Sequence, residues 1–589
     1  DHRHIFIDPD PDPAKSWEER NRMFHLPRSS WDDYDKSLIS KGGGVFPRSQ
    51  KSIPLTPEIC EALGIDAETI DPAGLINAVL KAPVDLIWFG GIGTYVKAKS
   101  ESNAEVGDPS NGAHIRAKVI GEGANLGVTQ AGRIEFALAG GRINTDFIDN
   151  SAGVDSSDNE VNIKIPLNRE MQEGRLTFED RNKLLAEMEE EVIEIVLEDN
   201  RLQTLAISIA ERGGAGAIPP LVRAIEILEE QGILNRAVEG LGTNEELLRR
   251  AQEQRGLTRP ELAVLLSTSK MALQKAIEGG KLTEDATLTP ELCNAFPRRM
   301  QELHGDAIMA HRLRKEIIAT KVANRFVNRL GITAPFSLTE EEGASFGQAA
   351  AGFVATERLF GMHDLWRELD TMDAPEEVRL ELFDQASKGL QLHIADLLRV
   401  TSPTMMLKEM VESIGPGLEK LNADVDDLLR EEARNQSKAQ RARLVELGAP
   451  EGIVHRIVRL FELNGGIGLA ALAKRLGIDE IQLTNAYTKL GEALGLDWAQ
   501  SQANRFEATD QWERLLTAGL ARDFEQLRLE FLEKRHDGDP KAAVDKWVKA
   551  QDARIAQFRR VVDRARTAPV TTAPMLAQIA TQARVLLGR

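Results

Sequence analysis

Two turns identify the architecture of this chain: Lys118-Val119-Ile120-Gly121-Glu122-Gly123-Ala124-Asn125 and, after a short interval, Asp149-Asn150-Ser151-Ala152-Gly153-Val154. Each follows an apolar segment of the length and composition typical of a buried strand. Small residues and uncharged hydrogen-bonding side chains therefore stand where two strands end. That arrangement is typical of the edge at which an open α/β sheet binds its ligand. The pair predicts a parallel sheet with a ligand site at the carboxyl ends of its strands.

Other segments of the first 165 residues fit the same fold. Short apolar runs predict four strands of a mostly parallel sheet, over residues 4–7, 84–89, 117–120 and 143–148. Residues 72–81 predict one of the helices between them. Residues 9–56 are rich in Pro, Asp, Ser and Gly, and they predict a long loop.

After about residue 165 the apolar spacing becomes helical and remains so. Thr258 with Glu261, and Thr339 with Glu342, have the spacing of capping boxes. Gly331 predicts the end of a long helix. We therefore expect an incomplete Rossmann-like α/β domain followed by a large all-α region, divided as 1–165, 166–335 (helical connection and bundle) and 336–589 (C-terminal helical domain).

The bulk composition excludes several classes of protein. The chain has 589 residues, a formal net charge of −19 and a sequence pI near 5.2. Nucleic-acid binding needs a basic face, so we expect no nucleic-acid partner. We find no apolar run long enough for a membrane span and no secretion signal. Cys60 and Cys293 lie far apart and offer neither a disulfide framework nor zinc-ligand spacing, which favours a cytoplasmic protein without a metal.

The two turns, in this order and at this separation, resemble the end of the cofactor domain of glutamate dehydrogenases and related amino-acid dehydrogenases. The resemblance is closest to the bacterial large NAD-dependent glutamate dehydrogenases, whose long C-terminal extension fits the helical remainder. It implies NAD as cofactor and L-glutamate and 2-oxoglutarate as ligands. NAD takes hydride from the α-carbon of glutamate, and water then hydrolyses the imine to 2-oxoglutarate and ammonium. It also implies a homo-oligomer.

Cofactor contacts are expected from four places. An acid at the end of a Rossmann strand bonds the ribose hydroxyls of NAD, and Asp8 fits that position, unless it stands in an exposed turn that meets only water. A glycine turn after the strand at 84–89 lets the backbone approach the ligand. The resemblance places the next turn against the nicotinamide ribose, and Asn150 near the carboxamide. The expected contacts are Asp8, Gly90, Gly91, Gly93, Glu122, Gly123, Ala124, Asn125 and Asn150.

Substrate contacts come from the same resemblance. Val154 and Ser157 match positions that line the side-chain pocket in glutamate-specific members. A hydroxyl at Ser157 suits a γ-carboxylate. Asn125 and Asn150 have a simpler alternative, which is that they only cap helices. The site as a whole requires the strand ends at Asp8, Gly90, Gly121 and Asn150 to lie side by side along one crevice.

Some expected parts of such an enzyme are absent from the sequence. There is no Gly-x-Gly-x-x-Gly between a strand and a helix near the start, and Lys41 with its three glycines falls in the wrong part of the fold for the catalytic lysine. The chain begins at Asp1, directly before a strand. We expect it to be a piece of a longer polypeptide that supplies the catalytic residues, and to bind NAD poorly and not turn over by itself.

Three alternatives remain open. One is another amino-acid dehydrogenase of the superfamily, acting on leucine, phenylalanine or valine. A second is a non-catalytic helical assembly module with a vestigial nucleotide fold. The third is a regulator using the helix–turn–helix-like segment 471–494, which the acidic charge of the chain disfavours.

Overall fold

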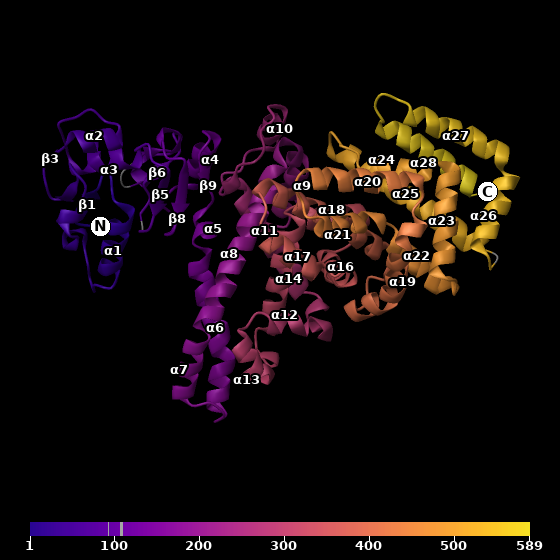
Figure 1. Ribbon diagram of the computed structural model, residues 1–589, viewed down its shortest axis with the longest axis horizontal. Coiled ribbons are helices and arrows are strands. Elements are labelled where there is room, and N and C mark those ends of the chain that lie inside the picture. Colours follow the sequence, from indigo (N-terminus) through magenta and orange to yellow (C-terminus); the bar gives the residue numbers. More distant parts are fainter. Residues whose placement is uncertain (92, 107–109, 537, 589) are drawn as a thin grey trace.

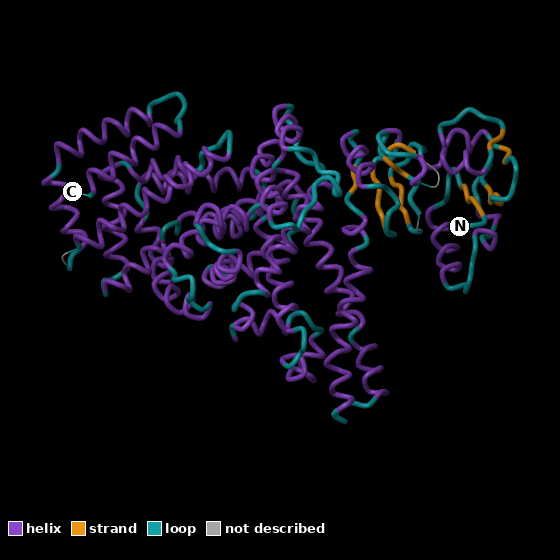
Figure 2. Tube along the Cα trace, turned by 180° about the vertical axis from the view of Figure 1, so that it is seen from behind, coloured by secondary structure: helices purple, strands orange, loops and turns teal. Residues whose placement is uncertain are grey.

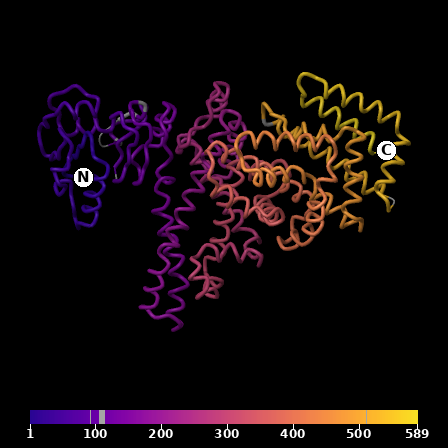
Figure 3. The backbone as a smooth tube through the Cα atoms, viewed as in Figure 1, coloured from indigo at the N-terminus to yellow at the C-terminus, as the bar shows by residue number. Residues whose placement is uncertain are grey.

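The computed structural model describes residues 1–91, 93–106, 110–536 and 538–588. The molecule is elongated, with its two termini at opposite ends (Figure 1). The chain proceeds along it from one end to the other, as the colours of Figure 3 show. Among the described residues, strands lie only in the N-terminal part, and helices make up most of the rest (Figure 2). The predicted class, an α/β part followed by a large helical region, is confirmed.

The N-terminal unit runs from β1 to α3 and has its own small core around Ile53, Ile59 and Leu75. Its strands form two separate pairs, and each pair is antiparallel. Its elements are β1 (His4–Ile7), α1 (Pro13–Phe24), β2 (Gly44–Pro47), β3 (Ile53–Pro54), α2 (Pro57–Leu63), β4 (Thr69–Ile70) and α3 (Pro72–Leu80).

Two predictions about this unit are wrong. Residues 9–56 are not one loop, because Asp12 caps a helix: its side chain accepts from the backbone N–H groups of Ala14 and Lys15, and Pro13 occupies the first turn. The strand at 4–7 exists but does not join the parallel sheet. It pairs with β2 instead, with Ile7 opposite Gly44, because β2 offers it a full edge of backbone groups.

The second unit, from β5 to α5, contains the predicted parallel sheet. Its three strands lie in the order β5-β8-β9, and all pairs are parallel. The elements are β5 (Leu86–Phe89), β6 (Val96–Lys97), β7 (Ser110–Asn111), β8 (Val119–Glu122), α4 (Gln130–Leu138), β9 (Arg142–Ile143) and α5 (Asp146–Asp149). The predicted strand at 143–148 is wrong beyond Ile143. The chain turns there into α5, whose first turn carries Asp146, a charge that a helix N-terminus favours.

Only one face of this sheet is covered by α4. Alternate residues of a strand point to opposite faces. Phe89 and Ile120 therefore face α4 and are buried in a core with Phe136. On the opposite face Leu86 is 54% and Trp88 60% exposed. The sheet thus presents a bare, largely apolar face.

The remaining chain is helical. The helices that follow the sheet are α6 (Ser151–Gln172), α7 (Phe178–Glu187), α8 (Glu189–Arg212), α9 (Ile218–Glu230), α10 (Asn244–Gln252), α11 (Arg259–Glu278), α12 (Thr289–Cys293), α13 (Arg298–Met309) and α14 (Arg314–Leu330). Then come α15 (Ala334–Glu342), α16 (Phe346–Leu359), α17 (Met362–Thr371), α18 (Glu376–Val400), α19 (Leu407–Leu428), α20 (Glu431–Glu446) and α21 (Glu451–Glu462). The last are α22 (Gly466–Leu476), α23 (Glu480–Leu494), α24 (Leu496–Asn504), α25 (Gln511–Arg535), α26 (Pro540–Ala550), α27 (Asp552–Arg566) and α28 (Ala573–Leu587).

One continuous apolar core joins these helices, from Ile148 to Leu587. At its centre α11 packs against α14 and α16, through fully buried side chains such as Leu265, Phe326 and Phe353. None of the helices in the described part of the chain has the length and apolar character that crossing a bilayer requires.

The helix ends test three predictions. The capping box of Thr258 and Glu261 is present at the start of α11, and α14 ends at Gly331 with φ +95°. Thr339 is not a cap, because it lies within α15 and its hydroxyl donates to the Phe336 carbonyl. Helices α6 and α15 run through positions 165 and 335, so the three-part division of the chain stays a prediction.

Replacing Gly132 with alanine tests how closely α4 packs on the sheet. A Cβ at Gly132 would lie 3.0 Å from backbone atoms of Lys97 in β6, and backbone has little room to yield. We expect Gly132→Ala to destabilise this unit by about 1–3 kcal/mol. Faster hydrogen exchange of the α4 and β6 amides would measure this loss of stability. Gly216→Ala is the control, because a Cβ there meets no described atom within 4 Å. Equal exchange in both variants would contradict this packing.

Candidate functional site

The carboxyl ends of β5 and β8 bring the two predicted glycine turns together. Phe89 and Glu122, the last residues of these strands, are register partners. The Ala124 N–H donates to the Phe89 carbonyl over 2.9 Å, which holds the second turn against the first. Gly90 and Gly91 are exposed just beyond β5. Ile92 lies outside the described residues, and Gly93 follows with φ +124°, a conformation suited to glycine.

The two predicted asparagines are in direct contact. Asn150 Nδ2 donates to Asn125 Oδ1 over 2.9 Å, although the residues come from different turns. Asn150 precedes α6, and its side chain makes no capping bond to that helix. Gly153 leaves room for this amide, because a Cβ at position 153 would lie 2.8 Å from Asn150 Oδ1. Between them, the two amides form a polar, uncharged pair at the sheet edge.

Asp149 fixes the distance between these turns. Its Oδ2 accepts from the Glu122 N–H at 2.9 Å, and its Oδ1 accepts from Asn144 Nδ2 at 2.8 Å. Burial raises the pKa of Asp149, an effect that the bond from Asn144 opposes. Asn144 in turn accepts from Arg259 Nε of α11 at 2.8 Å. The end of β8 is thereby tied to the turn before α6 and to the helical region.

Glu122 supports its turn from the α4 side of the sheet. Its side chain is fully buried. The carboxylate accepts hydrogen bonds from Arg133 Nε at 2.6 Å, Arg133 Nη2 at 2.9 Å and the Val128 N–H at 3.0 Å. Burial raises the pKa of Glu122, and Arg133 opposes that shift. The carboxylate therefore points away from the bare face, and only the Glu122 backbone stands at the edge.

Trp88 lies across the glycine turn on the bare face. A Cβ at Gly121 would lie 2.6 Å from the indole ring, and one at Gly123 would lie 2.3 Å from it. Any larger residue at either position would displace the ring. The glycines thus make a flat surface on which a planar group can rest, and in this structure that group is Trp88.

The first turns of α6 present the predicted substrate residues. Val154 and Ser157 are both exposed and stand three residues apart, so they share one face of the helix. That face begins just after Asn150. Val154 and Ser157 come four and seven residues after Asn150, which is the spacing of one face of a helix.

Asp8 is not brought to this edge, contrary to the expectation that four strand ends lie side by side. It follows β1, which belongs to a separate sheet. Both bonds that it receives there, from the backbone N–H of Ser40 at 3.0 Å and from the Ser40 hydroxyl, go to Oδ1. Lys41 lies in the same unit and pairs with Glu58 at 2.7 Å. The turns after β5 and β8 do share one edge, whereas Asn150 follows the helix α5 and not a strand, and it reaches that edge through its bond to Asn125.

Sequence reasoning missed the residues that position the site. Asp149 and Arg133 look like ordinary surface charges in the sequence, since their partners are defined only by the fold. Asn200 of α8 is another: its Nδ2 donates to the Ile148 carbonyl at 2.8 Å and to Ser151 Oγ at 2.6 Å. Asn200 lies on a helix about 50 residues further along the chain, and it bonds residues on both sides of Asn150.

The inner side of α6 carries a buried acid. Burial and the nearby Asp199 raise the pKa of Asp155 to about 6, while Lys321 opposes the shift. Asn159 Nδ2 donates to its Oδ1 at 3.0 Å, and Lys321 itself pairs with Asp199 at 2.8 Å. Close by, burial lowers the pKa of Lys270 to about 8, against the attraction of Asp199. These groups lie where α6, α8, α11 and α14 meet.

Comparison with known proteins gives a consistent result for both parts of the chain. The family described as "Bacterial NAD-glutamate dehydrogenase, catalytic domain" matches residues 1–210, and "Glutamate dehydrogenase, C-terminal" matches residues 254–584.

Three similar proteins carry the name NAD-specific glutamate dehydrogenase. The protein of Pseudomonas aeruginosa is 41% identical over 522 residues, 87% of this chain and 32% of the relative. The protein of Halomonas elongata is 37% identical over 575 residues, which are 95% of this chain and 36% of the relative. The protein of Mycobacterium tuberculosis is 36% identical over 587 residues, which are 96% of this chain and 36% of the relative. The chain thus spans about a third of the length of these relatives.

Removing Arg133 tests the support beneath the glycine turn. Arg133→Met leaves the Glu122 carboxylate buried without its partner, and breaking a buried pair in this way costs about 3–5 kcal/mol. We expect the unfolding transition of the α/β part to move to lower temperature in calorimetry. Lys118→Met is the control, since Lys118 pairs with Asp85 in solvent and should have no measurable effect. An Arg133→Met transition matching that of the wild type would contradict the assigned role.

The raised pKa of Asp155 predicts a pH-dependent stability. Because its folded-state pKa of about 6 lies above the ordinary 3.8, the stabilisation from the protonated form is present at acid pH and lost as pH rises through about 6. Discounted for solvent screening, the loss is about 1 kcal/mol. The Asp155→Asn variant has no carboxyl group at this position, so it should not lose this stability as pH rises. In urea unfolding, the free energy of unfolding of the variant should therefore rise relative to that of the wild type between about pH 4 and 7. Parallel curves of unfolding free energy against pH would contradict this role of Asp155.

Proposed function

The chain belongs to the bacterial NAD-specific glutamate dehydrogenases, and we propose that it forms the nicotinamide side of the cofactor site, and the helical region, of an enzyme that oxidatively deaminates L-glutamate. The observation that carries this proposal is the contact between Asn125 and Asn150 beside the Gly90 turn. Two uncharged amides and a flat glycine surface meet there at the carboxyl ends of parallel strands, which is where such sheets bind ligands.

The residues at this edge fit NAD. A Cβ at Gly91 would meet no described atom within 4 Å, so the backbone of that turn is open to a ligand. No carboxylate of the two turns competes for the ligand, because Arg133 holds that of Glu122, and donors hold that of Asp149. Gly90, Gly91, Gly93, Gly123, Ala124, Asn125 and Asn150 would hold the nicotinamide half of the cofactor. NAD, when bound, supplies the hydride acceptor.

The chain's own residues orient the reactants. Asn125 and Asn150 offer amide donors and acceptors that fix the plane of a carboxamide. Val154 and Ser157, exposed on the next turns of α6, would face the glutamate side chain, with the Ser157 hydroxyl donating to its γ-carboxylate. Asp8 would reach the ribose only where the rest of the protein joins β1 to β5, and then through Oδ2, the carboxylate oxygen that Ser40 does not use in the described structure. A leucine or phenylalanine dehydrogenase would be expected to present an apolar residue in place of Ser157.

The bare sheet face explains why we propose that the chain works within a longer polypeptide. Leu86 and Trp88 are exposed on β5, which is also an edge strand in the described sheet. Doubly wound sheets are covered on both faces. The remainder of the protein, which makes up most of each relative, would cover this face, join β5 to β1 and supply the general acid and base. We propose a cytoplasmic homo-oligomer, with this chain alone inactive.

Assays of the full-length protein test the function. With NAD we expect faster NADH formation from L-glutamate than from L-leucine, L-phenylalanine or L-valine, and faster turnover with NAD than with NADP. A preference for a branched or aromatic substrate would overturn the glutamate assignment. No NAD binding at millimolar concentration in calorimetry would favour the non-catalytic assembly module instead.

Replacing the asparagines tests the site itself. Each amide bond to the bound cofactor contributes about 0.5–1.5 kcal/mol, so Asn125→Ala and Asn150→Ala should each lower kcat/KM by about threefold to tenfold or more. Asn422→Ala, at an exposed position of α19 in the helical region, is the control. Because the two side chains bond each other, the double variant should lose less than the product of the single losses. Wild-type kinetics in both single variants would contradict the proposed site.

A further inference from the structure

Two residues of the helical region hold the Asn150 turn in place, Asn200 of α8 and Arg259 of α11. Asn200 Nδ2 donates to the Ile148 carbonyl at 2.8 Å and to Ser151 Oγ at 2.6 Å, so it bonds the backbone before Asn150 and the side chain after it. A turn that is bonded on both sides has little freedom to move. The position of the Asn150 carboxamide therefore depends on where α8 lies.

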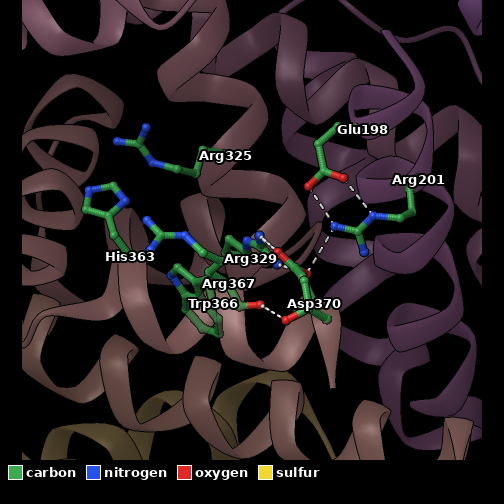
Figure 4. A pocket seen from close by; sticks show the side chains of 9 residues that line it. Glu198, Arg201, Arg325, Arg329, His363, Trp366, Arg367 and Asp370 are labelled. Carbon is green, nitrogen blue, oxygen red and sulfur yellow. Dashed lines mark hydrogen bonds and ion pairs between the residues drawn. The ribbon is translucent and has the colours of Figure 1, made fainter. Parts of the chain in front are cut away.

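Ion pairs fix α8 on both sides of Asn200. The residue before it, Asp199, pairs with Lys321 of α14 at 2.8 Å. The residue after it, Arg201, lies 3.4 Å from Asp370 of α17. Figure 4 shows the Arg201 guanidinium directed toward the Asp370 carboxylate, beside a pocket that both residues line. Because consecutive residues of a helix point about 100° apart, α8 binds the bundle with two neighbouring positions and the turn with Asn200.

Arg259 supports the same turn through the amide of Asn144. Its side chain is buried, and its Nε donates to Asn144 Oδ1 over 2.8 Å. A guanidinium group can only donate hydrogen bonds, so the oxygen of this amide must face Arg259 and its nitrogen must face away. The nitrogen donates to Asp149 Oδ1 at 2.8 Å, which leaves Oδ2 to accept from the Glu122 N–H. Arg259 therefore sets the direction of the hydrogen bonds in a chain that passes one residue before Asn150.

Removing the guanidinium would release this direction. The Asn144 amide would be free to turn over and to bring its oxygen against the Asp149 carboxylate, where two acceptors meet without a proton between them. Asp149 would then lose one of its two donors. The Asn150 turn, which follows directly, would no longer be held at a fixed distance from the end of β8.

Arg259 also joins the two supports to each other. Its Nη1 donates to Ser208 Oγ at 3.0 Å and to Glu211 Oε2 at 2.9 Å, and both of these residues belong to α8. The Glu211 side chain is 41% exposed, so it would stay solvated if Arg259 were replaced. Replacing Arg259 therefore removes a support of the turn without leaving a buried charge unpaired.

We propose that Arg259 and Asn200 are positioning residues for hydride transfer, which set the place of the Asn150 carboxamide beside the nicotinamide. This inference rests on the proposed function, because it assigns both residues to the same site. Each acts through a neighbour of Asn150 and not on the cofactor. Arg259 lies in the part of the chain, residues 254–584, that carries the C-terminal family match. The helical region thereby contributes to catalysis as well as to the fold.

Steady-state kinetics of the full-length protein with NAD and L-glutamate test the proposal. Arg259→Met and Asn200→Leu remove the donors and should each lower kcat/KM by about threefold to tenfold, the loss expected for Asn150→Ala itself. Arg259→Lys keeps a group that can only donate, so it should retain most of the wild-type kcat/KM. Arg255→Met, at an exposed arginine four residues earlier, is the matched control and should have wild-type kinetics. Calorimetry checks that each variant is folded at the assay temperature.

Double variants distinguish positioning from mere support of the fold. If both residues act through Asn150, Arg259→Met and Asn200→Leu should each cost less than about twofold in the Asn150→Ala background. A loss of equal size in both backgrounds would overturn the proposal, and so would wild-type kinetics in both single variants. A wild-type protein that neither binds NAD nor oxidises glutamate would instead reject the proposed function, and this inference with it.

Discussion

The carboxylate of Asp149 is the constraint on which the site depends. It receives the backbone N–H at the end of β8 and the side chain of Asn144, and so holds two turns at the spacing that lets Asn150 reach Asn125. A buried carboxylate with two donors is stable in place, whereas without them it would be costly to bury. The glycines, the asparagines and the start of α6 take their relative positions from this one side chain. Its link through Asn144 to Arg259 also makes the helical region part of the same framework.

How far the sequence predicts such a site depends on how local each feature is. The glycine turns after β5 and β8 follow short apolar runs, so these two strand ends and their common edge were predictable from pattern. The position of β1 was not, because strand pairing depends on which edge is available, and β2 provides one for Ile7. The segment after Ile143 reads as apolar strand, but Asp146 and Asp149 serve α5 and the β8 backbone instead. Polar residues such as Arg133 and Asn200 acquire roles only from long-range contacts, which no local pattern reveals.

The two halves of the chain differ in how complete they are. The helices share one apolar core with fully buried side chains from α5 to α28. The sheet has one face covered by α4 and another on which Leu86 and Trp88 meet solvent. Relatives are about three times longer than this chain. The helical region thus has a continuous apolar core that carries the α5–α6 turn, and the exposed face of the sheet is where we propose that the rest of the longer protein packs.

A structure of the full-length protein with NAD bound would locate the nicotinamide. We expect its carboxamide within hydrogen-bonding distance of Asn125 or Asn150, with Asp149 still bonded to the Glu122 N–H and the glycine turn against the ribose. Nicotinamide bound elsewhere, with the asparagine pair facing solvent, would contradict it.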